Sequence, residues 1–300
     1  MDIIKHITTD RLANQISQNS SYDGLFILLE GVKDINVFSK HFNKEAVKFV
    51  ICDGKYNQRE VWEKLEQRNE ARKLAIRDAD FIRLRGRLDK SYHDSFFITD
   101  HHDSEIMMAN SGMLEQCLRQ ALSIEQMNKI NISHPELLNE IKQLIYPLGC
   151  LKLANKIDNL GLVFKQKKEK SKELDLTKFI DFKTMTNKDV ISLITTCISY
   201  SNNLVAKGSI KTQDEIKNSY DRVLSCNHPI DEIVHGHDFS YALAQFVKKK
   251  LNQNNSQLKN GNETETFMAA CFDSKFFRKT NLFNDLANWE SNKSRSILDI

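Results

Sequence analysis

Residues 25–34 read LFILLEGVKD, a continuous apolar run that ends at Glu30 and Gly31. An uninterrupted apolar run of this length is typical of a strand covered on both faces, as strands of parallel sheets are. In the residues that follow, DINVFSKHF, apolar side chains recur at helical spacing, and Asp34 falls in the first turn, where a carboxylate favours the helix dipole. The stretch therefore predicts a strand, a turn and a helix, in that order.

Three further segments extend this pattern along the chain. We expect strands at VKFVIC (47–52), at the short run LAI (74–76) and at SFFIT (95–99), with a helix at QREVWEKLEQRNEARK (58–73). Strands that alternate with helices of this length form right-handed crossover units around a parallel sheet. The fold class is therefore predicted as α/β, and residues 1–103 are expected to form an α/β core that carries the catalytic residues.

The remainder of the chain has a different period. Apolar residues follow helical steps from Ile106 to Ala121 and from Val190 to Leu204, with no comparable strand between them. We therefore expect a helical region at 104–225 and a C-terminal helical segment at 226–300 that packs on the core or on a partner subunit. The charged run from Lys165 to Lys172 indicates a solvated helix end or linker, and QNNSQLKNGNETE (253–265) a loop.

Composition limits the function classes without choosing one. The 300 residues are 40% hydrophobic and 28% charged, which is typical of a globular protein and indicates neither a disordered nor a fibrous chain. The net charge of +3 is too small to indicate nucleic-acid binding by itself. The six cysteines form no CxxC pair, and no signal sequence or membrane-spanning run is present, so we expect a cytoplasmic protein without a membrane partner.

Acidic residues follow each of the four predicted strands. In an open α/β sheet, ligands bind outside the carboxyl ends of the strands, so these acids should converge on one edge. Crowded carboxylates repel one another unless protons or cations offset their charge. The residues are Glu30 after the first strand, Asp53 after the second, Asp78 and Asp80 after the third, and Asp100, Asp103 and Glu105 after the fourth.

A hard divalent cation is the natural occupant of such a site. Mg²⁺ prefers oxygen ligands and is usually held by one or two carboxylates plus substrate phosphates; Mn²⁺ is the alternative ion. Asp78 and Asp80 lie two residues apart and project to the same side, so both can reach one ion. Glu30 could ligate a second ion in a two-metal site or move a proton in a phosphodiester displacement.

The same segments resemble a known family. LFILLEGVKD is similar to the first motif of Toprim domains and LAIRDADF to the second, a strand that ends in D-x-D. The whole chain resembles the Toprim nucleases encoded beside ABC-type ATPases in phage-defence operons of the PARIS type. That resemblance extends to DGKYN (53–57), TDHHDSE (99–105), HGHDFSYAL (235–243) and FFRKTNLFNDLANWE (276–290).

The resemblance implies roles for particular residues. Glu30 would be the catalytic acid or base, and Asp78 and Asp80 would bind Mg²⁺. Supporting ligands would be Asp34, Asp103 and Glu105. It also implies a homodimeric toxin of abortive infection that an ABC-type ATPase restrains until a phage trigger releases it, with RNA, and tRNA foremost, as the substrate.

One feature of the sequence agrees with the implied partner. The chain contains no G-x-x-x-x-G-K-[ST] loop, so any ATP hydrolysis must come from another subunit. Two other functions stay open: a Toprim nuclease that processes or repairs DNA, and a Toprim scaffold that binds nucleic acid without cutting it. A scaffold has no need of Glu30, Asp78 and Asp80 together, which disfavours that alternative.

Several residues have a structural alternative to a functional role. Asp78 and Asp80 could cap a following helix, Asp53 suits a turn, and Asp103 could cap the helix that contains Ile106. His237 could face phosphate as a substrate-binding residue, beside Asp238 as a helix cap. Zinc is disfavoured at His101 and His102 because adjacent histidines point apart. The aromatic residues Phe276, Phe277, Phe283 and Trp289 are expected in the core or a dimer surface rather than stacked on bases.

Overall fold

The computed structural model describes residues 8–86, 94–165, 173–206, 208–255 and 257–299. The chain forms two compact units: unit 1 comprises Met1–Met113 and Met268–Ile300, and unit 2 comprises Leu114–Phe267. This division differs from the predicted ranges 1–103, 104–225 and 226–300, because residues 268–300 return to the unit that contains the N-terminal half. Nearly all of the lysine-rich run at 165–172 lies outside the described residues.

Unit 1 is built on a four-stranded parallel sheet. Its strands are β1 (Leu25–Leu29), β2 (Val47–Ile51), β3 (Lys73–Arg77) and β4 (Phe96–Ile98), in the order β2-β1-β3-β4. Each of the four strands lies at its predicted position, so the α/β class and the parallel sheet are confirmed. Because all four strands run the same way, their carboxyl ends lie at one edge of the sheet.

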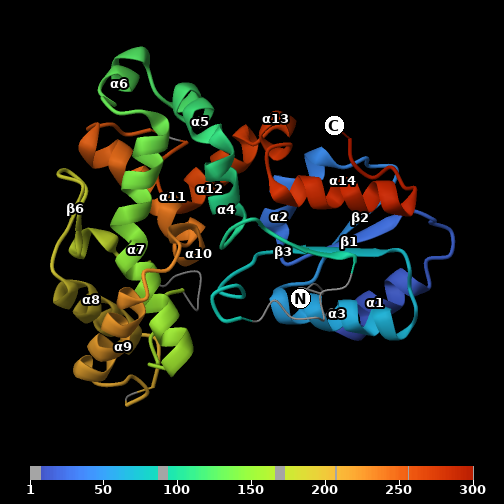
Figure 1. Cartoon of the computed structure of the whole chain (residues 1–300), viewed down its shortest axis with the longest axis horizontal. Helices are drawn as coiled ribbons and strands as arrows, with labels where there is room; N and C mark the ends of the chain where they lie inside the picture. Colours follow the sequence, from blue (N-terminus) through green and yellow to red (C-terminus); the bar gives the residue numbers. More distant parts are fainter. Residues whose placement is uncertain (1–7, 87–93, 166–172, 207, 256, 300) are drawn as a thin grey trace, which may run out of the picture. The chain divides into compact units, whose positions relative to one another are not determined.

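Helices cover both faces of this sheet. The helices α1 (Thr9–Ser17) and α3 (Lys55–Gln67) lie on one face, and α2 (Val32–Phe38) and α14 (Asn281–Lys293) lie on the other (Figure 1). Unit 1 also contains the short helices α4 (Ser104–Met108) and α13 (Ser274–Phe277), and a π-helical turn, η3 (Ala109–Met113). The helix α12 (Gly261–Cys271) contains the boundary between the two units.

The alternation of side chains along the strands divides the core of unit 1 into two layers. On one side of β1, Phe26 and Leu28 pack with Ile16 of α1 and with Trp62 and Leu65 of α3. An aromatic cluster, which packs Phe38 at the end of α2 with residues of the C-terminal segment, forms a second layer. Its rings are Phe38, His41, Phe272, Phe277 and Phe283.

Residues of the C-terminal segment complete unit 1. Phe276, Phe277 and Trp289 are buried, which confirms their predicted place in a hydrophobic core, and the half-buried Phe283 packs against Phe277. Leu298 forms an antiparallel bridge with Phe42, and the backbone of Asn43 donates to the Ile297 carbonyl at 2.8 Å. The last described residues therefore pair with the chain just before β2.

Unit 2 is mainly helical, as predicted. Its helices are α5 (Leu114–Ala121), α6 (Ile124–Asn128), α7 (His134–Asp158), α8 (Val190–Asn202), α9 (Gln213–Ser225), α10 (Ile230–Ile233), α11 (Gly236–Gln245) and the π-helical turn η5 (Phe246–Lys250). Two strands of two residues each, β5 (Ile180–Asp181) and β6 (Thr186–Asn187), form a small hairpin. The predicted loop from Gln253 is shorter than expected, because α12 begins at Gly261.

In the part of the chain that the structure describes, every helix is too short or too polar to traverse a lipid bilayer.

Candidate functional site

The turn after β1 holds Glu30 at the carboxyl edge of the sheet. The backbone N–H of Gly31, the residue that precedes α2, donates to Asp34 Oδ2 in the first turn of the helix at 2.8 Å. The Glu30 side chain is 23% exposed, so the chain buries most of it. Asp34 thus fixes the backbone that presents Glu30, whichever other role its carboxylate has.

The turn after β2 is attached to the same place. Parallel pairing continues beyond the strand, with Cys52 N donating to Leu29 O at 2.9 Å and Gly54 N donating to Glu30 O at 2.8 Å. Asp53 and Gly54 have positive φ values of 57° and 109°, and only glycine adopts the second readily. Asp53 is therefore part of a tight turn, as its structural alternative predicts.

A buried amide separates β1 from β3 near their carboxyl ends. The last aligned pair of these strands is Leu28 with Ala75. Beyond it, the Nε2 group of Gln58 on α3 donates to Leu28 O at 2.9 Å and to Ile76 O at 2.8 Å. Gln58 is fully buried, so this contact fixes where the two strands part to hold Glu30 and Asp78.

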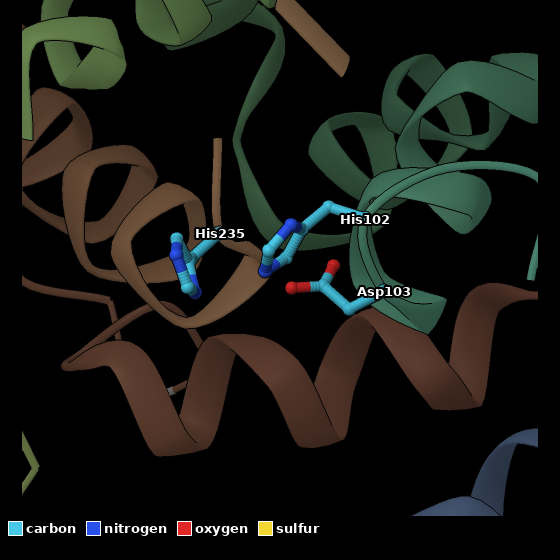
Figure 2. Close-up of side chains that lie close together, drawn as sticks. All are labelled: His102, Asp103 and His235. Carbon is cyan, nitrogen blue, oxygen red and sulfur yellow. The ribbon is translucent and has the colours of Figure 1, made fainter. Parts of the chain in front are cut away.

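The loops after β3 and β4 bind one another through the acidic residues. Asp78 Oδ1 accepts from the backbone N–H of Ser104 at 2.9 Å, and Asp80 N donates to His102 O at 2.6 Å. Asp103 caps α4, because its Oδ1 accepts from Ile106 N at 3.0 Å. Figure 2 shows the side chains of His102 and Asp103 projecting from adjacent positions of the loop that precedes α4.

These contacts decide between the alternatives for the acids. The capping role of Asp103 is confirmed, and it leaves Glu105 in the first turn of α4. A capping role for Asp78 and Asp80 is wrong, because the described residues 81–86 form turns rather than a helix. Asp80 itself has a positive φ of 48°, a left-handed conformation that asparagine and aspartate tolerate better than most residues.

Partial burial and like charges act together on Asp78 and Glu30. Burial raises the pKa of Asp78 well above its ordinary value, and the charges of Asp103, Glu105, Asp34 and Glu30 raise it further. Burial also raises the pKa of Glu30 to about 7, although Arg77 opposes the change. The acids that follow β1 and β4 are thus near enough to Asp78 for their charges to disfavour its ionisation.

Asp80 lies in a different electrostatic environment. Burial opposes its ionisation, but Lys55 outweighs that effect and holds the pKa of Asp80 below its ordinary value. Lys55 Nζ lies 2.7 Å from Asp80 Oδ2. The guanidinium of Arg77, on β3, lies 3.8 Å from Glu30 and 3.9 Å from Asp80. Cations therefore accompany Glu30 and Asp80, whereas carboxylates surround Asp78.

The donor set fits a hard divalent cation. The side chains that converge are carboxylates, the oxygen ligands that Mg²⁺ and Mn²⁺ prefer. In addition, Glu30 Oε1 is buried and has no hydrogen-bond partner among the described residues, a condition that a bound cation would relieve. The residues that would hold such an ion are Asp78 and Glu30, with Asp80, Asp103, Glu105 and Asp34 as further oxygen ligands.

Sequence reasoning missed three residues of this site. Lys55 is the third residue of the quoted motif DGKYN, Arg77 is the last residue of β3, and Gln58 lies in the predicted helix. A basic residue directly before the D-x-D pair was the available signal for Arg77. Nothing in the spacing indicates that Lys55 crosses from the end of β2 to Asp80.

The remaining predicted residues lie elsewhere. His237 belongs to unit 2, where its Nδ1 lies 2.6 Å from Glu265 Oε1, and this contact raises the pKa of His237. Asp238 is not the cap of α11, because that helix begins at Gly236; its carboxylate pairs with Lys152 instead. Asp100 accepts from the first N–H groups of α14.

Comparison with known proteins adds no relative: no protein-family model matches the chain, and no curated protein matches its sequence.

Proposed function

We propose that this chain is a divalent-metal-dependent phosphodiesterase, and specifically a nuclease of the Toprim class. The observation that carries the proposal is the group of acids at the carboxyl edge of the sheet, where the charges of Asp103, Glu105, Asp34 and Glu30 raise the pKa of the half-buried Asp78. A fold that needed only stability would not gather like charges at a partly buried position. Glu30 Oε1 is buried without a hydrogen bond among the described residues, and its nearest cation, Arg77 Nε, is 3.8 Å away, so a bound metal ion would supply a closer partner.

Each residue then has a chemical role. A metal bound at Asp78 and its neighbours would activate water and stabilise the charge that develops on the phosphodiester. Glu30 transfers a proton to or from the reacting oxygens, and Asp80 contributes to metal binding. Arg77 keeps Glu30 and Asp80 in place by its two ion contacts.

We further propose, on sequence resemblance, that the nuclease is the toxin of an anti-phage system. It would act as a homodimer in the cytoplasm, cleave RNA with tRNA foremost, and be restrained by an ABC-type ATPase. All six cysteines are free in the structure and five are buried, which accords with a reducing compartment.

The first test is substitution of the two central acids. Glu30→Gln and Asp78→Asn should each reduce Mg²⁺-dependent cleavage by at least about a hundredfold, the usual cost of removing one transition-state-stabilising group. Circular dichroism should show an unchanged fold. Asp94→Asn is the matched control, since the Asp94 side chain is 89% exposed. This variant should cleave at the rate of the wild type.

Sequencing of nucleic-acid ends identifies the substrate. The wild type and Glu30→Gln are expressed without a partner, and cellular RNA and DNA ends are compared. New tRNA ends that depend on Glu30 are expected. Nicked DNA with intact RNA would indicate a DNA-processing nuclease, and unchanged nucleic acid with both proteins folded would contradict the proposal.

A further inference from the structure

Tyr56 is an aromatic residue in solvent at the edge of the sheet that carries the carboxylates. It is the second residue of α3, and 74% of its surface is exposed. A single exposed apolar side chain is common on protein surfaces and by itself indicates nothing. The position of this ring, and the charge beside it, distinguish it.

The backbone that carries Tyr56 is firmly anchored. Gly54 N binds Glu30 O at 2.8 Å, and Gln58 N binds Gly54 O at 3.0 Å. Asn57 Nδ2 also donates to Asp53 O at 3.0 Å, and the Gln58 side chain is fixed in the core. The ring is therefore mobile only about its own side-chain bonds, which lowers the entropy lost when it binds a flat ligand.

A cation links this ring to the carboxylates. Lys55 Nζ lies 6.0 Å from the centroid of the Tyr56 ring and 2.7 Å from Asp80 Oδ2. The Lys55 side chain is 35% exposed. An aromatic face and an ammonium group thus lie side by side within reach of the site where a phosphodiester would be cut.

The start of α2 also carries an exposed apolar side chain. Val32 is the first residue of α2, follows Glu30 by two positions and is 64% exposed. The strands β1 and β2, which precede α2 and α3, are adjacent and parallel in the sheet. Val32 and Tyr56 therefore supply apolar surface at the same edge of the sheet as the acids.

We propose that Tyr56 stacks on an unpaired nucleobase and that Lys55 contacts the adjoining phosphate. The inference rests on the proposed nuclease function and adds a substrate class: a nucleic acid whose scissile linkage lies beside an unstacked base. Aromatic side chains stack on bases that are splayed out of a helix, and lysine neutralises the backbone. A base inside a duplex presents neither face to Tyr56.

Binding without cleavage gives the direct test. In the Glu30→Gln background, fluorescence anisotropy measures affinity for an end-labelled single-stranded RNA in Mg²⁺. Tyr56→Ala should weaken binding roughly 5- to 150-fold, the factor expected for loss of one stacked base. Tyr56→Phe keeps the ring and should retain the wild-type affinity.

An abasic RNA separates stacking from a general effect on the fold. When the base beside the cleaved linkage is removed, Tyr56→Ala should change affinity about twofold or less, because the two changes delete the same contact. Lys55→Met should weaken the binding of both RNAs and lower the salt dependence of binding by about one counterion. Ile124→Ala is the control, because Ile124 is an 82% exposed apolar residue of unit 2.

The outcomes distinguish this inference from the function on which it rests. Equal losses on the intact and abasic RNAs, or a Tyr56→Ala protein that binds as the wild type does, overturn the stacking role even if the wild type cleaves RNA. Base-dependent binding through Tyr56, with no cleavage of any nucleic acid by the wild type, supports the inference and contradicts the nuclease function.

Discussion

At the scale of single residues, the electrostatic environment of Asp78 has a consequence for stability. Its carboxyl group is half-buried, and carboxylates from the two segments that follow β1 and β4 raise its pKa, so the folded chain bears repulsion that the unfolded chain does not. A bound divalent cation would convert this repulsion into attraction. The stability of unit 1 should therefore depend on the cation.

The prediction is measured as thermal unfolding with and without Mg²⁺. Saturation of the wild type to about a hundred times its Kd should stabilise it by about 2.7 kcal/mol. Asp78→Asn should be at least as stable as the wild type without the ion, since it removes a like charge, and should lose most of the stabilisation by Mg²⁺. An unchanged response to Mg²⁺ in this variant would exclude Asp78 as a ligand.

His41 is a second residue whose burial has a measurable consequence. It is fully buried, and its ring stacks on Phe277 with 4.5 Å between ring centroids. Burial, and then the charge of Lys40, lower the pKa of His41 to about 4. The unfolded chain takes up this proton near pH 6.5, whereas the folded chain does so only near pH 4.

The free energy of unfolding should therefore decrease as the pH falls from 6.5 to about 4, and it should level off below pH 4. From neutral pH to about pH 5, His41 should account for a loss of about 2 kcal/mol in the free energy of unfolding. Urea titrations of the wild type and His41→Phe at the two pH values measure the difference. Equal pH dependence in the two proteins would show that His41 is not the titrating group.

The acids at the strand ends could be predicted from the sequence, but the basic side chains that pair with them could not. Glu30, Asp78 and Asp80 follow apolar runs directly, and the topology of parallel strands brings such positions to one edge. Lys55 reaches Asp80 from the end of a different strand, a contact that depends on the order β2-β1-β3. Neighbours across a sheet have no fixed spacing in the chain.

At the level of elements, Gln58 of α3 controls the gap between β1 and β3. Its amide donates to a carbonyl of each strand, at 2.9 and 2.8 Å, in a fully buried position. Both bonds would be lost in Gln58→Met, a replacement of similar length without donors. The strands could then no longer be held at their present separation.

Gln58→Met should lower the free energy of unfolding by about 1–3 kcal/mol, the sum for two hydrogen bonds. It should also reduce nuclease activity, because the spacing between Glu30 and Asp78 depends on the same contact. Denaturant titration and cleavage assays measure the two effects. Gln67→Met, at an exposed position of the same helix, should change neither, and equal effects of both variants would contradict the role of Gln58.

The elements that were predicted well are those whose pattern is local. The four strands are short apolar runs between polar turns, and α8 follows a clear helical period. The cap of α11 was predicted three residues late, at Asp238 rather than His235, because Asp238 has the chemistry of a cap but pairs with Lys152 instead. The sequence does not distinguish an aspartate that caps a helix from one that forms an ion pair.

The molecule as a whole differs from its predicted division for a related reason. Helical periodicity marks residues 268–300 as helices but does not say which core they join. In the structure, α14 contributes Leu282 and Leu286 to unit 1, and Asp100 caps its first turn. The assignment depends on long-range packing, which no local pattern contains.

A chain that ends at residue 267 should therefore lose unit 1. The truncation removes Phe277, Leu282 and Leu286 from the core, and each such loss costs about 2–5 kcal/mol, against a total stability of about 5–15 kcal/mol. Hydrogen exchange should show unprotected amides in β1 and β3. A peptide of residues 268–300 added in trans should restore protection, and protected strands without it would contradict this dependence.

The bridge between Phe42 and Leu298 also has a consequence for protein synthesis. The carboxylates of the candidate site are all translated within the first 105 residues, yet the unit that holds them is closed by backbone contacts of residues 297–299. A ribosome-bound nascent chain thus carries the reactive groups long before it can arrange them. If the chain is a toxic nuclease, this order of synthesis delays its activity until translation has passed Asp299.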